Sequence, residues 1–106
     1  MTKGDMIRVN SRDGFTFDAY HVKAHGPRKG GVIVVQEIFG LSDHIKEMAE
    51  RLGAAGYEAI APSMYDRAAP GFIVQPADVA ANMARGVELA MGNGPENAMN
   101  DIGGVF

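Results

Sequence analysis

The chain has 106 residues, of which 46% are hydrophobic and 22% charged, a composition typical of one globular domain. It carries a formal net charge of −3 and no cysteine, which excludes disulfides, thiolate metal sites and a cysteine nucleophile within these residues. The slight acidity offers no basic surface to nucleic acid or an anionic membrane, and the strongest apolar run is too short to span a bilayer. We therefore expect a cytoplasmic protein with neither kind of partner.

Two strands joined by a tight turn are predicted at the start of the chain, over residues 6–10 and 15–22. Asp13-Gly14 lies between them, and Asp-Gly between β-favouring runs indicates a hairpin because glycine accepts positive φ without a Cβ clash. Three apolar residues of the second strand share one face at period two: Phe15, Phe17 and Ala19. We expect a hairpin with one face buried and the other in water.

A loop over residues 23–30 precedes the strongest strand signal in the chain. Residues 31–35 form a continuous, largely β-branched run that ends abruptly at Gln36 and Glu37. Continuous apolarity is typical of a strand covered on both faces, as in the parallel sheets of α/β folds. The sequence therefore predicts a strand that is buried on both sides.

A helix and another strand are predicted next. The helix begins near Ser42 or Asp43, either of which can cap it, and runs to residue 55, where Gly56 supplies a left-handed stop. Its predicted apolar stripe consists of Ile45, Met48, Ala49 and Leu52. A strand over residues 57–61 follows, so that strand, helix and strand form a βαβ unit.

The last third of the chain is predicted to be a loop followed by two helical segments. The loop covers residues 63–75, and Pro76 suits the first turn of a helix. Four apolar residues of this helix are expected to face inward: Val79, Met83, Val87 and Met91. Residues 92–94 end it, and Pro95 opens a further helical pattern. Three residues share the apolar face of that pattern: Ala98, Ile102 and Val105.

Ligands of open α/β sheets bind beyond the carboxyl ends of the parallel strands, and Glu37 directly follows strand 31–35. Desolvation raises the pKa of a carboxyl group in such a place unless it has a partner, and perturbed carboxylates often mark functional sites. The structural alternative is that Glu37 caps its loop or pairs with a cation. Neither strand end carries a glycine-rich phosphate motif and the histidine spacings match no metal motif, so we expect no cofactor and no metal.

Three segments resemble the dienelactone hydrolase family of the α/β-hydrolase superfamily: residues 32–41, which contain Q-E-I-F-G, residues 52–57 and residues 61–67. The N-terminal hairpin also fits this family. The resemblance implies an α/β protein with a partial α/β-hydrolase fold, in which the antiparallel hairpin is followed by parallel βαβ strands with flanking helices. Because the chain stops at Phe106 inside a helical pattern, we expect residues 1–106 to be the N-terminal part of a single such domain, truncated before the nucleophile elbow.

The resemblance also implies roles for particular residues. It assigns to Glu37 contact with the nucleophile of a Cys-His-Asp triad, and to the backbone N–H of Ile38 a place in the oxyanion hole. Candidate substrate-binding residues are Phe39, Tyr65 and Arg85. The arginine that binds the carboxylate of dienelactone in this family corresponds to Asn82 here, with Arg85 one turn on, which argues against dienelactone itself as the substrate.

The expected function is hydrolysis of a small-molecule ester or lactone, with the 106-residue chain alone inactive because His21, His25 and His44 do not match the triad histidine. A non-catalytic structural or binding module, or a stable remnant, is the alternative. Such a chain would cover its unpaired sheet edge with a second copy, forming a homo-oligomer, or with another chain. A flavodoxin-like domain would require the loop after Val35 to bind phosphate.

Overall fold

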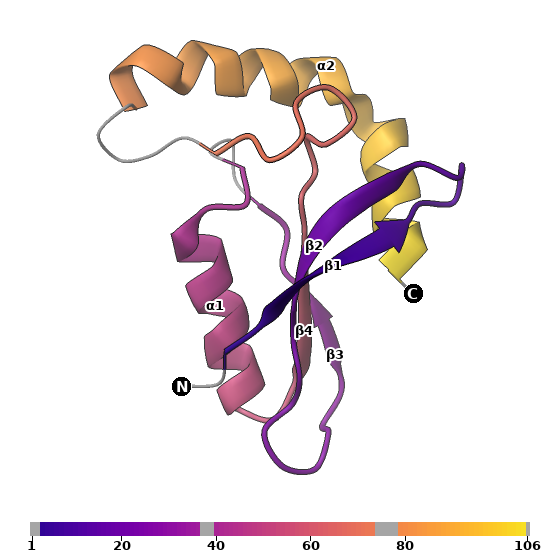
Figure 1. Ribbon diagram of the computed structural model, residues 1–106, viewed down its shortest axis with the longest axis vertical. Coiled ribbons are helices and arrows are strands. Elements are labelled where there is room, and N and C mark those ends of the chain that lie inside the picture. Colours follow the sequence, from indigo (N-terminus) through magenta and orange to yellow (C-terminus); the bar gives the residue numbers. More distant parts are fainter. Residues whose placement is uncertain (1–2, 37–39, 74–78, 106) are drawn as a thin grey trace.

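The computed structural model, which describes residues 3–36, 40–73 and 79–105, is built on a four-stranded mixed sheet. The strands are β1 (Asp5–Asn10), β2 (Thr16–Val22), β3 (Gly31–Ile33) and β4 (Glu58–Pro62). Their order across the sheet is β1-β2-β4-β3, with β2 antiparallel to β1 and β4, and β3 parallel to β4. Helix α1 (Asp43–Ala54) packs against one side of the sheet, and the C-terminal end of α2 (Val79–Val105) lies on the other (Figure 1). The predicted α/β class is confirmed.

The β1–β2 hairpin confirms the predicted turn and corrects the predicted burial. Gly14 has a φ of +88°, a conformation that suits glycine, and Val9 pairs with Phe17 across the two strands. One face of β1 is exposed, as expected. The second strand is buried on both faces, because it lies between β1 and β4 and because Tyr20 and Val22 pack against α1 on the face opposite Phe17.

Strand β3 lies at the edge of the sheet, which corrects the expectation that it is covered on both faces. Its parallel pairing with β4 is extended past Ile33 by the Val34 N–H, which donates to the carbonyl oxygen of Ile60 at 2.9 Å. Val34 packs against the core cluster that contains α1, whereas the Val35 residue is 54% exposed. In the described part of the chain, α2 packs mainly against β1 and β4, which leaves the second face of β3 open.

Helix α1 begins after Ser42 and is followed by Gly56 with a φ of +101°, both as predicted. The Ser42 side chain makes no capping hydrogen bond, so the cap proposed for its hydroxyl is wrong. The buried residues of the helix are Ile45, Ala49 and Gly53. Met48 is exposed, against prediction, because the buried stripe continues to Gly53, which packs against Val22 on the side of the helix away from Met48.

The C-terminal region forms one helix, α2, of 27 residues, where two helical segments were predicted. Residues 92–94 do not end the helix, and Pro95 lies inside it. Figure 1 shows that α2 bends part-way along its length, as expected for an internal proline, which lacks an N–H and crowds the preceding turn. Within the described part of the chain, no helix is long and apolar enough to cross a membrane.

The inward face of α2 differs from the predicted one in its first half. Leu89 is buried against the loop that follows β4, whereas Val87 and Met91, which were expected inside, are 41% and 79% exposed. In the second half Ala98 and Ile102 pack inward, as predicted. The predicted inward side chains of Val79, Met83 and Val105 lie outside the described part of the structure.

The close approach at Gly53 gives a test of the packing of α1. Gly53→Ala is expected to lower the free energy of unfolding by about 1 kcal/mol or more, because overpacking against the Val22 side chain outweighs the roughly 1 kcal/mol gain in helix propensity. The matched control is Gly92→Ala in α2, where an added Cβ meets nothing within 4 Å and stability should rise. Urea denaturation measures both, and stabilisation by both substitutions would contradict the packing.

Candidate functional site

The carboxyl ends of β3 and β4 lie next to each other at one edge of the sheet. The two strands are parallel, and the pairing of Val34 with Ile60 carries them side by side toward Gln36 on one chain segment and Ser63 on the other. This is the edge at which open α/β sheets bind their ligands. The candidate site is therefore the meeting point of the segment after β3 with the loop after β4.

Gln36 joins these two segments through its side chain. The Met64 N–H donates to Gln36 Oε1 at 2.8 Å, and the Gln36 carboxamide also hydrogen-bonds to the phenol of Tyr65. Burial raises the pKa of Tyr65, and the hydrogen bond from Gln36 partly offsets this. Tyr65 is thus held as a neutral phenol beside the end of β3. The sequence motif contained Gln36, but its bonding partners are 28 and 29 positions away and gave no local signal.

The chain is also fixed at Gly40, the last residue of the Q-E-I-F-G motif. Gly40 has a φ of +85° and forms an isolated antiparallel bridge with Ile73. A Cβ at this position would overlap the carbonyl oxygen of Phe72, so glycine is required by both conformation and space. The predicted site residues Glu37, Ile38 and Phe39 lie outside the described residues, and their proposed roles stay predictions.

The loop after β4 is braced by the buried carboxylate of Asp66. The Ser63 hydroxyl donates to Asp66 Oδ1 at 2.7 Å, and the Gly71 N–H donates to the same oxygen at 3.1 Å. The second oxygen, Oδ2, accepts from the Asp18 N–H of β2 at 2.7 Å. Ser63, one of the serines near a strand end, is therefore engaged in holding this loop against the sheet.

Arg67 connects the same loop to two other parts of the chain. Its Nη2 donates to Asp13 Oδ1 and to Asp101 Oδ1, both at 2.8 Å, and to Ser11 Oγ at 3.2 Å. The guanidinium also lies over the ring of Phe15, with 4.7 Å between its Cζ atom and the ring centroid. The β1–β2 turn, the loop after β4 and the last turns of α2 therefore meet at one side chain.

The pKa values of the two carboxylates that share Arg67 are shifted in opposite directions. Hydrogen bonds from Arg67 and then Ser11 hold the pKa of Asp13 well below its usual range. Asp101 is only 1% exposed, and burial raises its pKa despite the Arg67 hydrogen bond. Sequence reasoning missed this cluster, although a carboxylate at 101, inside the apolar face of Ala98 and Ile102, is a signal that a buried cation is needed.

The structure does not bring the two remaining candidate substrate contacts together. Arg85 donates to Glu88 on its own helix at 2.9 Å and lines a hollow of about 270 Å³ beside Arg67. Tyr65 does not line this hollow; its ring packs 5.9 Å from that of Phe72, in the cluster that also contains Leu89. Among the described side chains, Tyr65 is at the strand ends and Arg85 is not.

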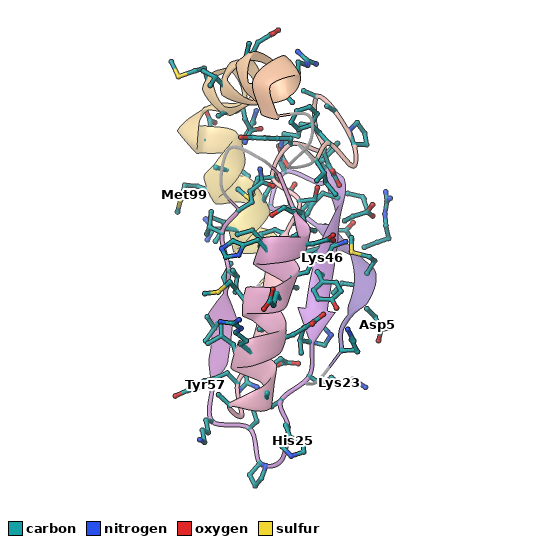
Figure 2. The ribbon with its side chains drawn as sticks, turned by 90° about the vertical axis from the view of Figure 1, so that its left-hand side faces the viewer. Asp5, Lys23, His25, Lys46, Tyr57 and Met99 are labelled. Carbon is teal, nitrogen blue, oxygen red and sulfur yellow. The ribbon has the colours of Figure 1, made fainter. Side chains whose placement is uncertain are left out.

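The histidines lie where the sequence placed them. His21 belongs to the hairpin, and its Nε2 is 2.9 Å from Glu58 Oε2. His25 is exposed at the end of the loop before β3 and points away from the sheet (Figure 2). His44 is exposed in the first turn of α1. In the part of the chain that is described, no group of three or more histidine and acidic side chains is placed to hold a metal ion.

The model of the dienelactone hydrolase family matches residues 17–102 of the chain. The matched range contains every part of the site described above except the hairpin turn. It includes the carboxyl ends of β3 and β4 and the loop after β4. The chain belongs to the dienelactone hydrolase family.

Curated relatives support the family assignment. The chain is 33% identical to carboxymethylenebutenolidase 1 of Cupriavidus pinatubonensis over 98 residues, which cover 92% of this chain and 42% of that protein. It is 37% identical to a carboxymethylenebutenolidase of Pseudomonas putida over 81 residues, or 74% of this chain and 32% of that protein. The chain therefore spans less than half the length of these relatives.

Solved structures also match this chain over less than half of their own length. The structure named m3DLH superposes with a TM-score of 0.56 at 25% identity, covering 87% of this chain and 41% of that one. The dienelactone hydrolase-like promiscuous phosphotriesterase P91 gives a TM-score of 0.56 at 24% identity, covering 94% and 41%. The four strands and two helices correspond to part of the α/β-hydrolase fold of this family.

The bond network of Gln36 predicts a stability and a spectroscopic effect. Gln36→Leu should lower the free energy of unfolding by about 1–3 kcal/mol, because the buried Met64 N–H loses its acceptor. It should also raise the pKa of Tyr65 further, because the hydrogen bond that lowers it is lost. Urea unfolding and ultraviolet titration of the phenols measure the two effects, with Tyr65→Phe identifying the Tyr65 signal. Unchanged titration in the leucine variant would argue against the bond.

The Arg67 cluster predicts a pH-dependent loss of stability. Arg67→Met should lower the free energy of unfolding by about 3 kcal/mol or more near neutral pH, because Asp101 stays buried without its cation. The native pKa of Asp101 is already raised, and losing Arg67 raises it further, so the native variant binds a proton that the unfolded chain lacks. The loss should therefore shrink as the pH falls toward 5.

Urea unfolding of both proteins at neutral and acidic pH measures this difference. The matched control is Arg85→Met, which removes only the exposed pair with Glu88 and should cost less than about 1 kcal/mol at either pH. A loss at Arg67 that is equally small, or that does not change with pH, would contradict the role assigned to the buried pair.

Proposed function

We propose that the chain is the N-terminal part of a carboxylic ester or lactone hydrolase whose Cys-His-Asp triad is supplied from outside these 106 residues. The observation that carries this proposal is the family match over residues 17–102, which contains both strand ends of the candidate site. The activity is assigned to the whole protein, because the chain spans less than half the length of its curated relatives. We place this protein in the cytoplasm, without a metal or cofactor.

In the proposed reaction, a cysteine thiolate attacks the carbonyl carbon of the substrate. Negative charge develops on the carbonyl oxygen, where the Ile38 N–H donates a hydrogen bond, and Glu37 contacts the nucleophile. The carbon–oxygen bond of the ester or lactone then breaks, and the released oxygen takes a proton from the triad histidine. Water hydrolyses the acyl-thioester and restores the thiolate. Support for this placement comes from Gln36 and Gly40, which fix the chain on either side of the two residues.

The substrate contacts are proposed at Phe39, Tyr65 and Arg85. Tyr65 has the strongest support, because its phenol is held at the strand ends by Gln36. Arg85 has less, because it pairs with Glu88 and lines a separate hollow. The curated relatives are named as carboxymethylenebutenolidases. Asn82 stands at the position where the family resemblance places an arginine for the carboxylate of dienelactone, so we propose a different small ester or lactone.

A chimera tests the hydrolase proposal. Residues 1–106 are joined to the part of the Cupriavidus pinatubonensis relative that follows its matched segment, and p-nitrophenyl acetate is the substrate. We expect turnover by the chimera and none above the buffer rate by the 106-residue chain, which contains no cysteine. Ile38→Pro, which removes the N–H, should lower kcat by about 10²–10³-fold, while Ile38→Val should retain it.

Two outcomes would contradict the proposal. One is a chimera that folds, as judged by circular dichroism, but does not turn over the ester. The other is an Ile38→Pro chimera that folds and keeps the full rate.

A second candidate function is a non-catalytic module that associates through its sheet edge. The observation that favours it is the position of β3 at the end of the sheet, where its backbone groups face outward and Val35 is 54% exposed. Such a module would pair with a second copy or with another chain. The chimera experiment distinguishes this function from hydrolysis, because a folded chimera would then show no turnover.

A further inference from the structure

The loop after β4 holds the Q-E-I-F-G segment at both of its described ends. At one end, the Met64 N–H donates to Gln36 Oε1 at 2.8 Å. At the other end, Gly40 forms its bridge with Ile73, and the Phe72 carbonyl oxygen lies where a Cβ of residue 40 would be. The two points of contact lie at the beginning and toward the end of the loop, so the loop must keep one shape to make both.

Asp66 forms hydrogen bonds directly beside both points of contact. Its Oδ1 accepts from the Ser63 hydroxyl at 2.7 Å, and Ser63 is the chain neighbour of Met64. The same oxygen accepts from the Gly71 N–H at 3.1 Å, and Gly71 is the chain neighbour of Phe72. One buried carboxylate oxygen therefore joins the two parts of the loop that hold the segment.

The second oxygen of Asp66 anchors this arrangement to the sheet. The pairing of β2 with β4 ends at Ala19 and Pro62, and the Ser63 N–H extends it by donating to the Asp18 carbonyl oxygen at 2.8 Å. Beyond this point the Asp18 N–H donates to Asp66 Oδ2, at 2.7 Å, in place of a strand. The shape of the loop is thus fixed relative to a central strand of the sheet, which is the rigid support that a functional site requires.

The chemistry of these bonds requires a carboxylate at position 66. All three partners of the side chain are donors, and an ionised carboxylate has two acceptor oxygens and no proton to give. An asparagine has a single acceptor oxygen. Its amide group would face either the Asp18 N–H or the two donors at the other oxygen, and a buried donor would then lack an acceptor.

We infer that Asp66 is a positioning residue of the hydrolase, acting on the reaction through the backbone of the Q-E-I-F-G segment. The inference rests on the proposed function, in which Ile38 of that segment donates its N–H to the oxyanion. Such a donor stabilises the transition state only when it is placed beforehand, and small displacements of it are costly. Asp66 is only 5% exposed and does not itself contact the substrate. Its replacement should therefore lower kcat and leave KM nearly unchanged.

Kinetics of the chimera with the Cupriavidus pinatubonensis relative test this role. Asp66→Asn should lower kcat for p-nitrophenyl acetate by about 10- to 10²-fold and change KM by less than about twofold, because the affected donor acts in the transition state. The matched control is Asp18→Asn. It makes the same chemical change beside the same contact, but removes only a partly exposed carboxylate that pairs with Arg8, and kcat should stay as it is.

A double-mutant cycle separates positioning from a general loss of stability. In the Ile38→Pro chimera the N–H is absent, so Asp66→Asn should lower kcat no further there. A purely structural role would lower kcat by the same factor in both backgrounds. If the asparagine variant does not fold, Ser63→Ala takes its place, because it removes one of the three donors and keeps the carboxylate. It should show the same pattern with a loss of about two- to fivefold.

Amide hydrogen exchange of the 106-residue chain tests the same contact without catalysis. The Met64 N–H bonds to Gln36 and not to Asp66, so its exchange rate reports whether Asp66 holds the segment. Asp66→Asn should speed exchange at Met64 by about fivefold or more, while the amides of the β1–β2 ladder keep their rates. In the Asp18→Asn control, exchange at Met64 should be unchanged.

Three results would overturn the inference. The first is unchanged exchange at Met64 in a folded Asp66→Asn chain. The second is an active chimera that keeps its kcat after this substitution, and the third is an equal loss of kcat in the Ile38→Pro background. A chimera that folds but is inactive before any substitution contradicts the proposed function and with it the catalytic role of Asp66. The exchange rates then still show whether Asp66 holds the segment, so the two failures are distinguishable.

Discussion

The arrangement of the chain around the sheet depends on the half-buried guanidinium of Arg67. Its hydrogen bonds to Asp13 and Asp101 connect the first turn of the chain with the last turns of α2, and both are anchored to the loop that carries Tyr65. A charge in this place is costly to desolvate, and the two carboxylates compensate it. The same contact requires Gly103 and Gly104, which lie close to the hairpin turn. Larger residues at these two positions would keep Asp101 away from Arg67.

The candidate site is held in place by a second set of contacts, which involve no charged group. Gln36 and Gly40 stand on either side of Glu37, Ile38 and Phe39, and each is tied to the loop after β4. A backbone N–H that stabilises an oxyanion must be placed before the reaction begins, so fixed chain on both sides of it is the kind of support that such a site requires. Asp66 and Arg67 hold the loop itself, which links the site to the same buried cluster.

Local signals in the sequence were sufficient to predict where the hairpin, α1 and β3 lie, but not which side of each helix is buried. Asp13-Gly14, Gly56 and the apolar run after residue 30 identify the hairpin, the end of α1 and β3, because each depends on neighbouring residues only. The exposure of Met48 and Met91 was predicted wrongly because it depends on which side of each helix meets distant segments. The pairing of Gln36 with Met64 and of Arg67 with Asp101 is non-local for the same reason. Glu37 and Ile38 remain predictions that rest on the family motif.

The apolar spacing of α2 is informative in spite of the wrong prediction. Periodicity at Val87 and Met91 indicates a face that is suited to burial, and the fold buries the opposite side of the helix through Leu89. A helix with apolar residues on two sides can pack against two partners, and the described residues supply only the first. The face of the sheet opposite α1 is likewise open around Ile33 and Ile60 in the described part of the chain. In a domain that extends beyond these 106 residues, as proposed, both apolar surfaces are places where the rest of the polypeptide can pack, and both lie away from the strand ends of the candidate site.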